Sequence, residues 1–252
     1  MTTDLARRSL LIGIGLSLLV PRPVRAQRSL DRQHRPQLDL PILAEDPTAV
    51  PIHAWVDHPM EPDHYIKSIE IRMDKDPVAY KGKFLFTPAN GRASVAFQMR
   101  SGVGGVVTAE ADCSKHGRFV GTKEVRVTEG GCTTAPDQSG RNRLGNPMLR
   151  LPRSIRVGRI VEVRTKVDHN SYTGLALKNG RFIRQVPAFY IKQMLVYLDE
   201  QKVSEFQMTS AVSPDPLIRF PLKATRSGRL RVVFINNEGL RWEVAEQLRP
   251  RG

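Results

Sequence analysis

The chain has 252 residues, of which 40% are apolar and 25% are charged, and its formal net charge is +14. This length allows one large domain or two of modest size, each with an ordinary hydrophobic core. The sequence argues against nucleic-acid binding, because it has no dense basic run, no recognition helix and no interleaving of aromatic with basic residues. Acidic protein partners or small anions fit the charge better, and simple solubility is the alternative.

The N-terminus has the layout of an export signal. Arg7 and Arg8 precede an apolar run from Leu10 to Val20, and a small-residue cleavage signature ends at Ala26. The run is too short for the roughly 20 residues that span a bilayer, so no membrane span is expected. The arginine pair favours the twin-arginine route over the general secretory route. Residues 1–26 are therefore predicted to be a signal peptide and the mature protein to be periplasmic.

Residues 27–129 are predicted to form the first domain. Ile69, Ile71 and Met73 alternate with charged residues, which is typical of a strand with one buried face. Turn signals recur about every ten residues, the spacing of an antiparallel sandwich. The other strand-like segments of this half are residues 51–56, 83–86, 93–99, 106–111 and 124–127.

Residues 130–153 are rich in Gly, Pro, Asn, Ser and Thr and have no periodicity, so they are predicted to be a linker. Residues 154–252 return to alternating patterns, and Asn236–Gly239 is a hairpin signal. No segment predicts a long amphipathic helix. The fold class is therefore all-β, with two antiparallel β-sandwich domains in tandem.

Cys132 follows Gly130 and Gly131, which remove side-chain cover and let the backbone bend freely. A thiol on such an arm suits thiol exchange or a covalent adduct better than packing. The alternative is a disulfide with Cys113, because an even number of cysteines in an exported protein is by default paired. A protein with that disulfide would be a structural accessory of a periplasmic dehydrogenase.

The first half resembles SoxY, the sulfur-carrier subunit of bacterial thiosulfate oxidation. The resemblance rests on residues 40–45 (LPILAE) and on residues 123–128 (KEVRVT), which lead into Gly-Gly-Cys. The second half resembles SoxZ, the binding partner of SoxY, over residues 158–164, 225–228 and 237–239. Fused carrier proteins of this group, including those linked to quinoprotein alcohol dehydrogenases, have the same order.

The resemblance implies that both halves are immunoglobulin-like sandwiches that pair within one chain, and that the protein catalyses nothing. It implies a covalent sulfur adduct on the thiol of Cys132. The implied partners are periplasmic sulfur-oxidation enzymes of the SoxXA, SoxB and SoxCD types, or a quinoprotein dehydrogenase system. One departure concerns residues 133–134, which are threonines where SoxY ends in Gly-Gly. The cysteine is therefore expected in a tethered loop rather than on a free tail.

A second constellation consists of His58-Pro-Met, then His64, and a distant Cys113-Ser-Lys-His116. Histidine and cysteine suit iron, zinc or copper. The pattern resembles superoxide reductase, another immunoglobulin-like domain, in which four histidines and one cysteine hold a non-haem iron. Carried over residue by residue, the resemblance makes His58, His64, Cys113 and His116 candidate metal ligands, and iron a candidate cofactor.

The fourth histidine of that pattern has no match by spacing, although His34 and His53 are available. An iron site with superoxide reductase-like chemistry is therefore the alternative function. Histidines that only form hydrogen bonds near the sheet edge are the simpler interpretation. If Cys113 is a metal ligand, Cys132 is left as the free thiol.

Overall fold

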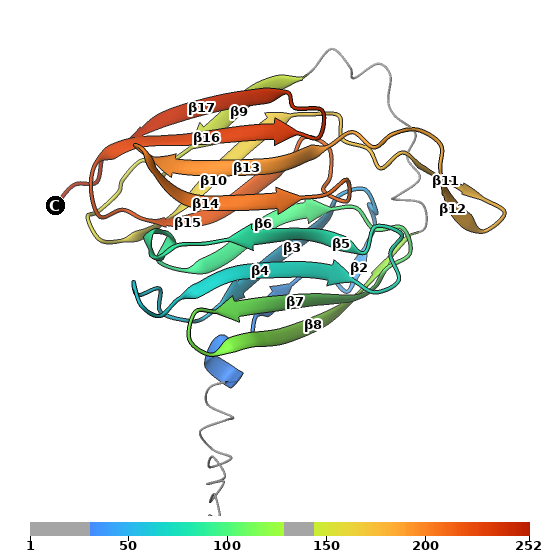
Figure 1. Cartoon of the computed structure of the whole chain (residues 1–252), viewed down its shortest axis with the longest axis horizontal. Helices are drawn as coiled ribbons and strands as arrows, with labels where there is room; N and C mark the ends of the chain where they lie inside the picture. Colours follow the sequence, from blue (N-terminus) through green and yellow to red (C-terminus); the bar gives the residue numbers. More distant parts are fainter. Residues whose placement is uncertain (1–30, 129–143) are drawn as a thin grey trace, which may run out of the picture.

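The structure is a computed structural model in which residues 31–128 and 144–252 are described (Figure 1). The predicted signal peptide, its export route and the arm Gly130–Cys132 lie outside the described residues. Residues 31–34 are helical, and almost all other regular structure is β-strand. Within the described residues, no helix has the length and apolar character needed to cross a membrane.

The strands follow one another through both halves of the chain. The first half contains β1 (Gln37–Asp39), β2 (Leu43–Ala44), β3 (Val50–Val56), β4 (Ile66–Met73), β5 (Tyr80–Leu85), β6 (Ala93–Met99), β7 (Gly105–Cys113) and β8 (Gly117–Val127), with a short 3-10 helix, η1 (Pro88–Asn90), before β6. The second half contains β9 (Gly145–Arg150), β10 (Ile160–Asp168), β11 (Leu175–Lys178), β12 (Arg181–Arg184), β13 (Ile191–Leu198), β14 (Gln201–Met208), β15 (Leu217–Lys223), β16 (Gly228–Asn236) and β17 (Arg241–Leu248).

Two large sheets face each other, and each contains strands of both halves (Figure 1). The six-stranded sheet has the order β1-β3-β6-β15-β10-β9, and the nine-stranded sheet has the order β17-β16-β13-β14-β5-β4-β7-β8-β2. The halves therefore meet where β5 pairs with β14 and where β6 pairs with β15. The pairing is antiparallel except between β2 and β8. The predicted all-β antiparallel sandwich class is confirmed, and the two sandwiches are joined edge to edge.

Phenylalanines from both halves fill the core at this junction. Phe84 packs against Phe97 and against Phe206, with ring centroids 5.0 and 5.3 Å apart. Phe206 in turn meets the edge of Phe220 at 5.6 Å. Aromatic pairs in these tilted geometries add to the free energy gained by burying their area. The junction is thus part of one continuous core.

Buried polar groups also cross the junction. The side chains of Lys81 and Asp76 are wholly buried, and their charged groups lie 3.0 Å apart. The Lys81 ammonium also donates to the carbonyl of Arg100. The Arg100 guanidinium donates to the carbonyl of Ser171 in the second half, at 2.8 Å. A buried charge is tolerated only where it is paired and hydrogen-bonded, so this network requires both halves to be in register.

The predicted linker 130–153 is too long at its C-terminal side, because part of it forms β9. This strand pairs with β10, with Arg150 opposite Arg164, and the side chain of Leu149 is buried. Pro147 obscures the strand pattern in the sequence. Proline cannot donate to a ladder, and β9 accommodates it because it is the edge strand of its sheet.

Candidate metal centre and carrier arm

Four segments of the first half come together at one end of it and carry four histidines and one cysteine. His34 ends the helical residues 31–34, His58 and His64 lie between β3 and β4, Cys113 ends β7, and His116 lies in the turn to β8. Gly117 has a φ of +80°, which favours glycine and allows the tight turn.

The loop before β4 and the turn after β7 are tied together. The Ser114 amide donates to the Tyr65 carbonyl at 2.9 Å, and the Tyr65 amide donates to the Ser114 hydroxyl at 3.1 Å. His64 itself exchanges two main-chain hydrogen bonds with Glu61, both of 3.1 Å. These bonds fix the backbone on either side of the histidines.

Four imidazole nitrogens form a chain of close contacts. His58 Nε2 lies 3.1 Å from His64 Nε2, and His64 Nε2 lies 3.1 Å from His116 Nδ1. His116 Nδ1 lies 3.0 Å from His34 Nε2, and Cys113 Sγ lies 3.9 Å from His116 Nδ1. The ligand atoms of His34, His58, His64 and Cys113 all lie within 4.8 Å of one another. Four side chains of types that can bind a metal therefore converge, and His116 Nδ1 contacts three of them.

The nitrogen spacing distinguishes between two coordination geometries. Metal–nitrogen bonds of about 2.1 Å place two ligands about 3.0 Å apart at right angles, but about 3.4 Å apart in a tetrahedron. The three contacts of 3.0–3.1 Å among His58, His64, His116 and His34 match the right-angled arrangement. The cluster therefore suits a metal with a square set of nitrogens better than a tetrahedral structural zinc.

Burial disfavours the charged form of two of these imidazoles. Desolvation, together with the charges of the neighbouring histidines, lowers the pKa of His58 to about 4, although the hydrogen bond to Pro59 acts in the opposite direction. Desolvation also lowers the pKa of His64, followed by the effects of His116 and His34. His58 Nδ1 contacts the carbonyl of Pro59, which leaves Nε2 facing the cluster. An outer hydrogen bond of this kind orients a metal-ligating histidine.

The structure brings together the four residues that the sequence singled out as candidate ligands, and it adds His34. The sequence offered His34 and His53 as substitutes for the missing histidine and could not place either by spacing. His53 does not join the cluster, because it lies on β3, where its Nε2 is 2.9 Å from the Ser94 hydroxyl and its ring stacks on Trp55.

The carrier arm begins at the other end of β8. β8 pairs with β7 from Cys113 opposite Gly117 to Gly105 opposite Val125. Beyond it, Thr128 is the last described residue before the arm, and its hydroxyl donates to the Glu45 carbonyl at 2.9 Å. The predicted thiol Cys132 and the glycines of the arm lie outside the described residues.

The length of β8 excludes the Cys113–Cys132 disulfide. Eleven residues separate Gly117 from Thr128, which amounts to roughly 35 Å along a strand. Four further residues extend at most about 14 Å. Disulfide-bonded residues have Cα atoms within about 7 Å. Cys132 therefore cannot reach Cys113, which is itself buried and free.

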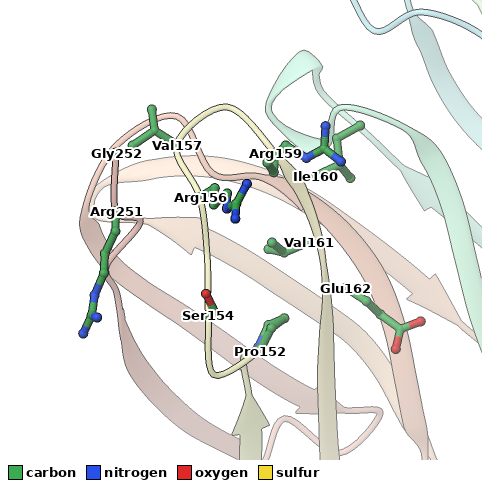
Figure 2. Close-up of a pocket in the computed structure, with 10 residues that line it drawn as sticks. All are labelled: Pro152, Ser154, Arg156, Val157, Arg159, Ile160, Val161, Glu162, Arg251 and Gly252. Carbon is green, nitrogen blue, oxygen red and sulfur yellow. The ribbon is translucent and has the colours of Figure 1, made fainter.

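A separate hollow opens at the first turn of the second half (Figure 2). It is lined by Arg156, Arg159 and Arg251 among others. Figure 2 shows the Arg251 guanidinium directed away from those of Arg156 and Arg159. Because the three cations do not converge on one point, the hollow is not a built anion site.

Two protein-family models match successive parts of the chain. Residues 24–132 match the family of the sulfur oxidation protein SoxY, and residues 149–247 match that of the sulphur oxidation protein SoxZ. No curated protein matches the chain.

Several solved structures are similar to parts of it. A superoxide reductase (neelaredoxin) from Ignicoccus hospitalis is 24% identical, covers 46% of this chain and 100% of its own, and has a TM-score of 0.38. A putative superoxide reductase from Thermotoga maritima is 22% identical, with coverages of 38% and 88% and a TM-score of 0.34. Murine CEACAM1b is 11% identical, with coverages of 85% and 99% and a TM-score of 0.24.

Proposed function

Because the chain belongs to the SoxY and SoxZ families, joined in tandem in one polypeptide, we propose that it is a periplasmic sulfur carrier whose cargo is held covalently on Cys132. Proteins of these families are carriers and accessories of sulfur oxidation, and this chain is likewise not an enzyme. The observation that carries the proposal is the boundary of the SoxY match, which ends at Cys132. The cysteine that the sequence predicts to be reactive is thus the last residue of the segment that matches the SoxY family.

The position of the arm supports the same function. Thr128 leaves the sheet at the end opposite the histidine cluster, roughly 35 Å away along β8. A cargo on Cys132 is therefore presented at one end of the molecule, away from the candidate metal centre. The partners proposed for this end are sulfur-oxidation enzymes of the SoxXA, SoxB and SoxCD types.

Loading of the thiol with thiosulfate requires an oxidant. The Cys132 thiol and thiosulfate form a sulfur–sulfur bond, giving the S-thiosulfonate, one proton and two electrons. The electrons pass to the electron acceptor of the loading enzyme, and the proton passes to solvent. The carrier supplies the nucleophilic sulfur and holds the product, since a thiolate is the reactive form of cysteine.

Intact-mass measurement of the mature protein, purified from a periplasm that is oxidising thiosulfate, tests this proposal. We expect a sulfur adduct that maps to Cys132 and is released by reducing agents. Cys132→Ser removes it, whereas the control Cys113→Ala keeps it. A wild-type protein that stays unmodified throughout thiosulfate oxidation would rule out the carrier role.

A second candidate function, metal binding, is favoured by the histidine cluster. We propose that His34, His58, His64, His116 and Cys113 hold one transition metal, with iron as the first candidate. The donor set of four imidazoles and one thiolate fits iron, and the spacing of the nitrogens at 3.0–3.1 Å is that of ligands at right angles. Bound iron would supply one-electron redox chemistry.

The protein's own residues determine access to this centre. Cys113 and His34 are buried, whereas His116 is exposed and His64 is partly exposed. Solvent and small molecules therefore approach the cluster from the side of His116. The Tyr65–Ser114 hydrogen bonds hold the two loops that carry His64 and His116 in place.

Metal analysis of protein reconstituted with ferrous iron under anaerobic conditions tests the second candidate. We expect one iron per chain, and an absorption band of ferric iron bound to a thiolate after oxidation. Protein that retains no transition metal under these conditions would contradict the metal centre without affecting the carrier proposal.

A further inference from the structure

One hairpin belongs to neither large sheet. β11 and β12 pair only with each other, from Leu175 opposite Arg184 to Lys178 opposite Arg181. Their two-residue turn, Asn179-Gly180, has positive φ at both positions, as type I′ hairpins require. Figure 1 shows the hairpin projecting from the end of the sandwich at which β8 finishes. An isolated two-stranded hairpin is marginally stable in water, so its exposed surface is not explained by folding alone.

The exposed surface of the hairpin is apolar and cationic. Leu177 is 50% exposed and Ile183 is 38% exposed. Lys178 lies directly opposite Arg181, an arrangement of like charges that destabilises a strand pair. The ten residues 175–184 contain no aspartate or glutamate. None of the ion pairs among the described residues involves Lys178 or Arg181.

Contacts connect this hairpin to the root of the arm. A Cβ atom placed on Gly102 would lie 3.2 Å from the Phe182 ring, so the hairpin rests against the loop before β7. Two residues further on, Gly104 lies against the main chain of Val125 and Val127. Val103, between these glycines, is 46% exposed. The loop of residues 100–104 therefore connects the two: it contacts the hairpin of the second half and packs against the end of β8 in the first half.

The other side of the arm root is also apolar. Leu43 on β2 pairs with Arg126 near the end of β8, and Ile42 accepts a hydrogen bond from the Arg126 amide. Ile42 is 78% exposed and Leu43 is 57% exposed. We call the surface formed by these exposed side chains the arm-side face: Ile42, Leu43, Val103, Leu177 and Ile183, with the cations Lys178 and Arg181.

We propose that the arm-side face is the docking surface for the protein that loads Cys132, and that this protein presents an apolar patch bordered by carboxylates. The inference rests on the carrier function proposed above. Charge complementarity selects the partner, because the hairpin presents two exposed cations, Lys178 and Arg181, beside the exposed apolar Leu177 and Ile183. Its location supports the role, because Thr128, the last described residue before Cys132, follows the end of β8 at this face. Several exposed apolar side chains at the same end of a soluble protein are typical of an interaction site.

The test uses the full mature chain and a purified thiosulfate-oxidising enzyme of the Sox type, with adduct formation on Cys132 followed by intact-mass measurement. Lys178→Glu/Arg181→Glu reverses the charges of the hairpin. We expect this double variant to raise the KM for the carrier at least tenfold at low ionic strength and to leave kcat unchanged. High salt is expected to reduce the difference from wild type, because it screens exposed charges.

Two controls separate docking from other effects. Arg156→Glu/Arg159→Glu makes the same change in charge at the hollow of Figure 2 and is expected to leave KM unchanged. Alkylation of Cys132 by iodoacetamide is expected to proceed at the wild-type rate in both variants. Leu177→Ser tests the apolar part of the face and is expected to raise KM without the salt dependence.

The outcomes distinguish this inference from the proposed function. If wild type is loaded and the hairpin variants have its KM, the docking surface is wrong and the carrier function stands. If wild type is never loaded, the carrier function fails and the docking surface fails with it. If sedimentation shows a wild-type dimer that the hairpin variants abolish while KM is unchanged, the face joins two copies of this chain, which also overturns the inference.

Discussion

The side-chain amide of Asn90 donates a hydrogen bond of 2.9 Å to the main-chain carbonyl of Pro221, although the two residues lie 131 positions apart. Asn90 is fully buried and also bonds to the hydroxyl of Ser204. Its oxygen accepts from the amide of Thr87 at 2.9 Å. One side chain from the first half thus forms hydrogen bonds with buried polar groups of the second half, at the junction where strands of the two halves pair.

Replacing Asn90 with alanine is expected to lower the free energy of unfolding by about 2–4 kcal/mol, because the substitution leaves buried polar groups of Thr87, Ser204 and Pro221 without their partner. Urea unfolding followed by fluorescence measures the change. Gln185→Ala, at an exposed position with no side-chain hydrogen bond in the described chain, is the control and should change it by less than about 0.5 kcal/mol. A loss for Asn90→Ala no larger than that of the control would contradict the role of this junction.

The continuous sheets also predict one unfolding transition for both halves. Because β5 pairs with β14 and β6 with β15, neither half can unfold without opening the sheets of the other. Calorimetry should therefore give a single peak whose calorimetric and van't Hoff enthalpies agree. Two resolved peaks would mean that the halves are energetically independent.

The buried pair Lys81–Asp76 predicts a non-additive response. Lys81→Met removes the ammonium group that lies 3.0 Å from the buried Asp76 carboxylate and should cost about 3–5 kcal/mol. Adding Asp76→Asn should recover part of this loss, because the amide oxygen can still accept from the Gly102 amide. The exposed pair of Lys67 and Asp112 provides the control, and Lys67→Met should cost no more than about 1 kcal/mol. Chemical denaturation of wild type, the two single variants and the double variant completes the cycle, and simple additivity would argue against a coupled pair.

The candidate metal centre predicts that His34 and His53 differ in their effect on iron binding. His34→Ala removes a converging nitrogen and should lower iron affinity at least tenfold, whereas His53→Ala should leave it unchanged. Competition with a chelator of known affinity gives both values. Equal effects of the two substitutions would show that the cluster does not act as a ligand set.

His169 predicts acid sensitivity of the second half. The residue is fully buried, stacks on Phe189 and contacts the Ser171 hydroxyl, and its Nε2 has no hydrogen-bond partner among residues 31–128 and 144–252. Desolvation lowers its pKa to about 4 from the ordinary value of 6.5. Between these values the unfolded chain binds more protons than the folded one, so stability is full above about pH 6.5 and falls as the pH drops toward 4.

His169→Gln removes this titration. Between pH 7 and pH 4, we expect the free energy of unfolding of the variant to fall by roughly 2–3 kcal/mol less than that of wild type. Urea midpoints at several pH values measure the difference. The remaining acid sensitivity comes from other histidines whose pKa values burial also lowers, such as His58. An identical pH dependence in wild type and variant would show that His169 does not contribute.

The sequence predicted those strands whose two faces differ. β10 alternates buried and exposed residues along nearly its whole length, and this is the pattern on which the prediction relied. β8 was predicted only over residues 124–127, because most of its side chains are exposed and Gly121 interrupts it. β9 and the β11–β12 hairpin were missed for related reasons, since one contains a proline and the other has no buried face.

The candidate ligands were predictable where a fixed local spacing holds them, as in Cys113 and His116. The contribution of His34 was not, because a residue from the N-terminal segment reaches the cluster only through tertiary packing. Phe119 stacks on the His34 ring with centroids 4.7 Å apart and holds it in place. Pro36, two positions after His34, ends the helical turn. It was the one local signal in the sequence for the end of this turn.

The shared sheets have a consequence for how such a carrier is produced. Each half made separately would present two open strand edges, β5 and β6 in one and β14 and β15 in the other, and open edges are templates for aggregation. Two separate chains would meet only by diffusion, and dilution would pull them apart. A single polypeptide fixes the ratio of the halves at one to one and makes their association independent of concentration. Every copy that is synthesised therefore carries the surface that closes its own edges.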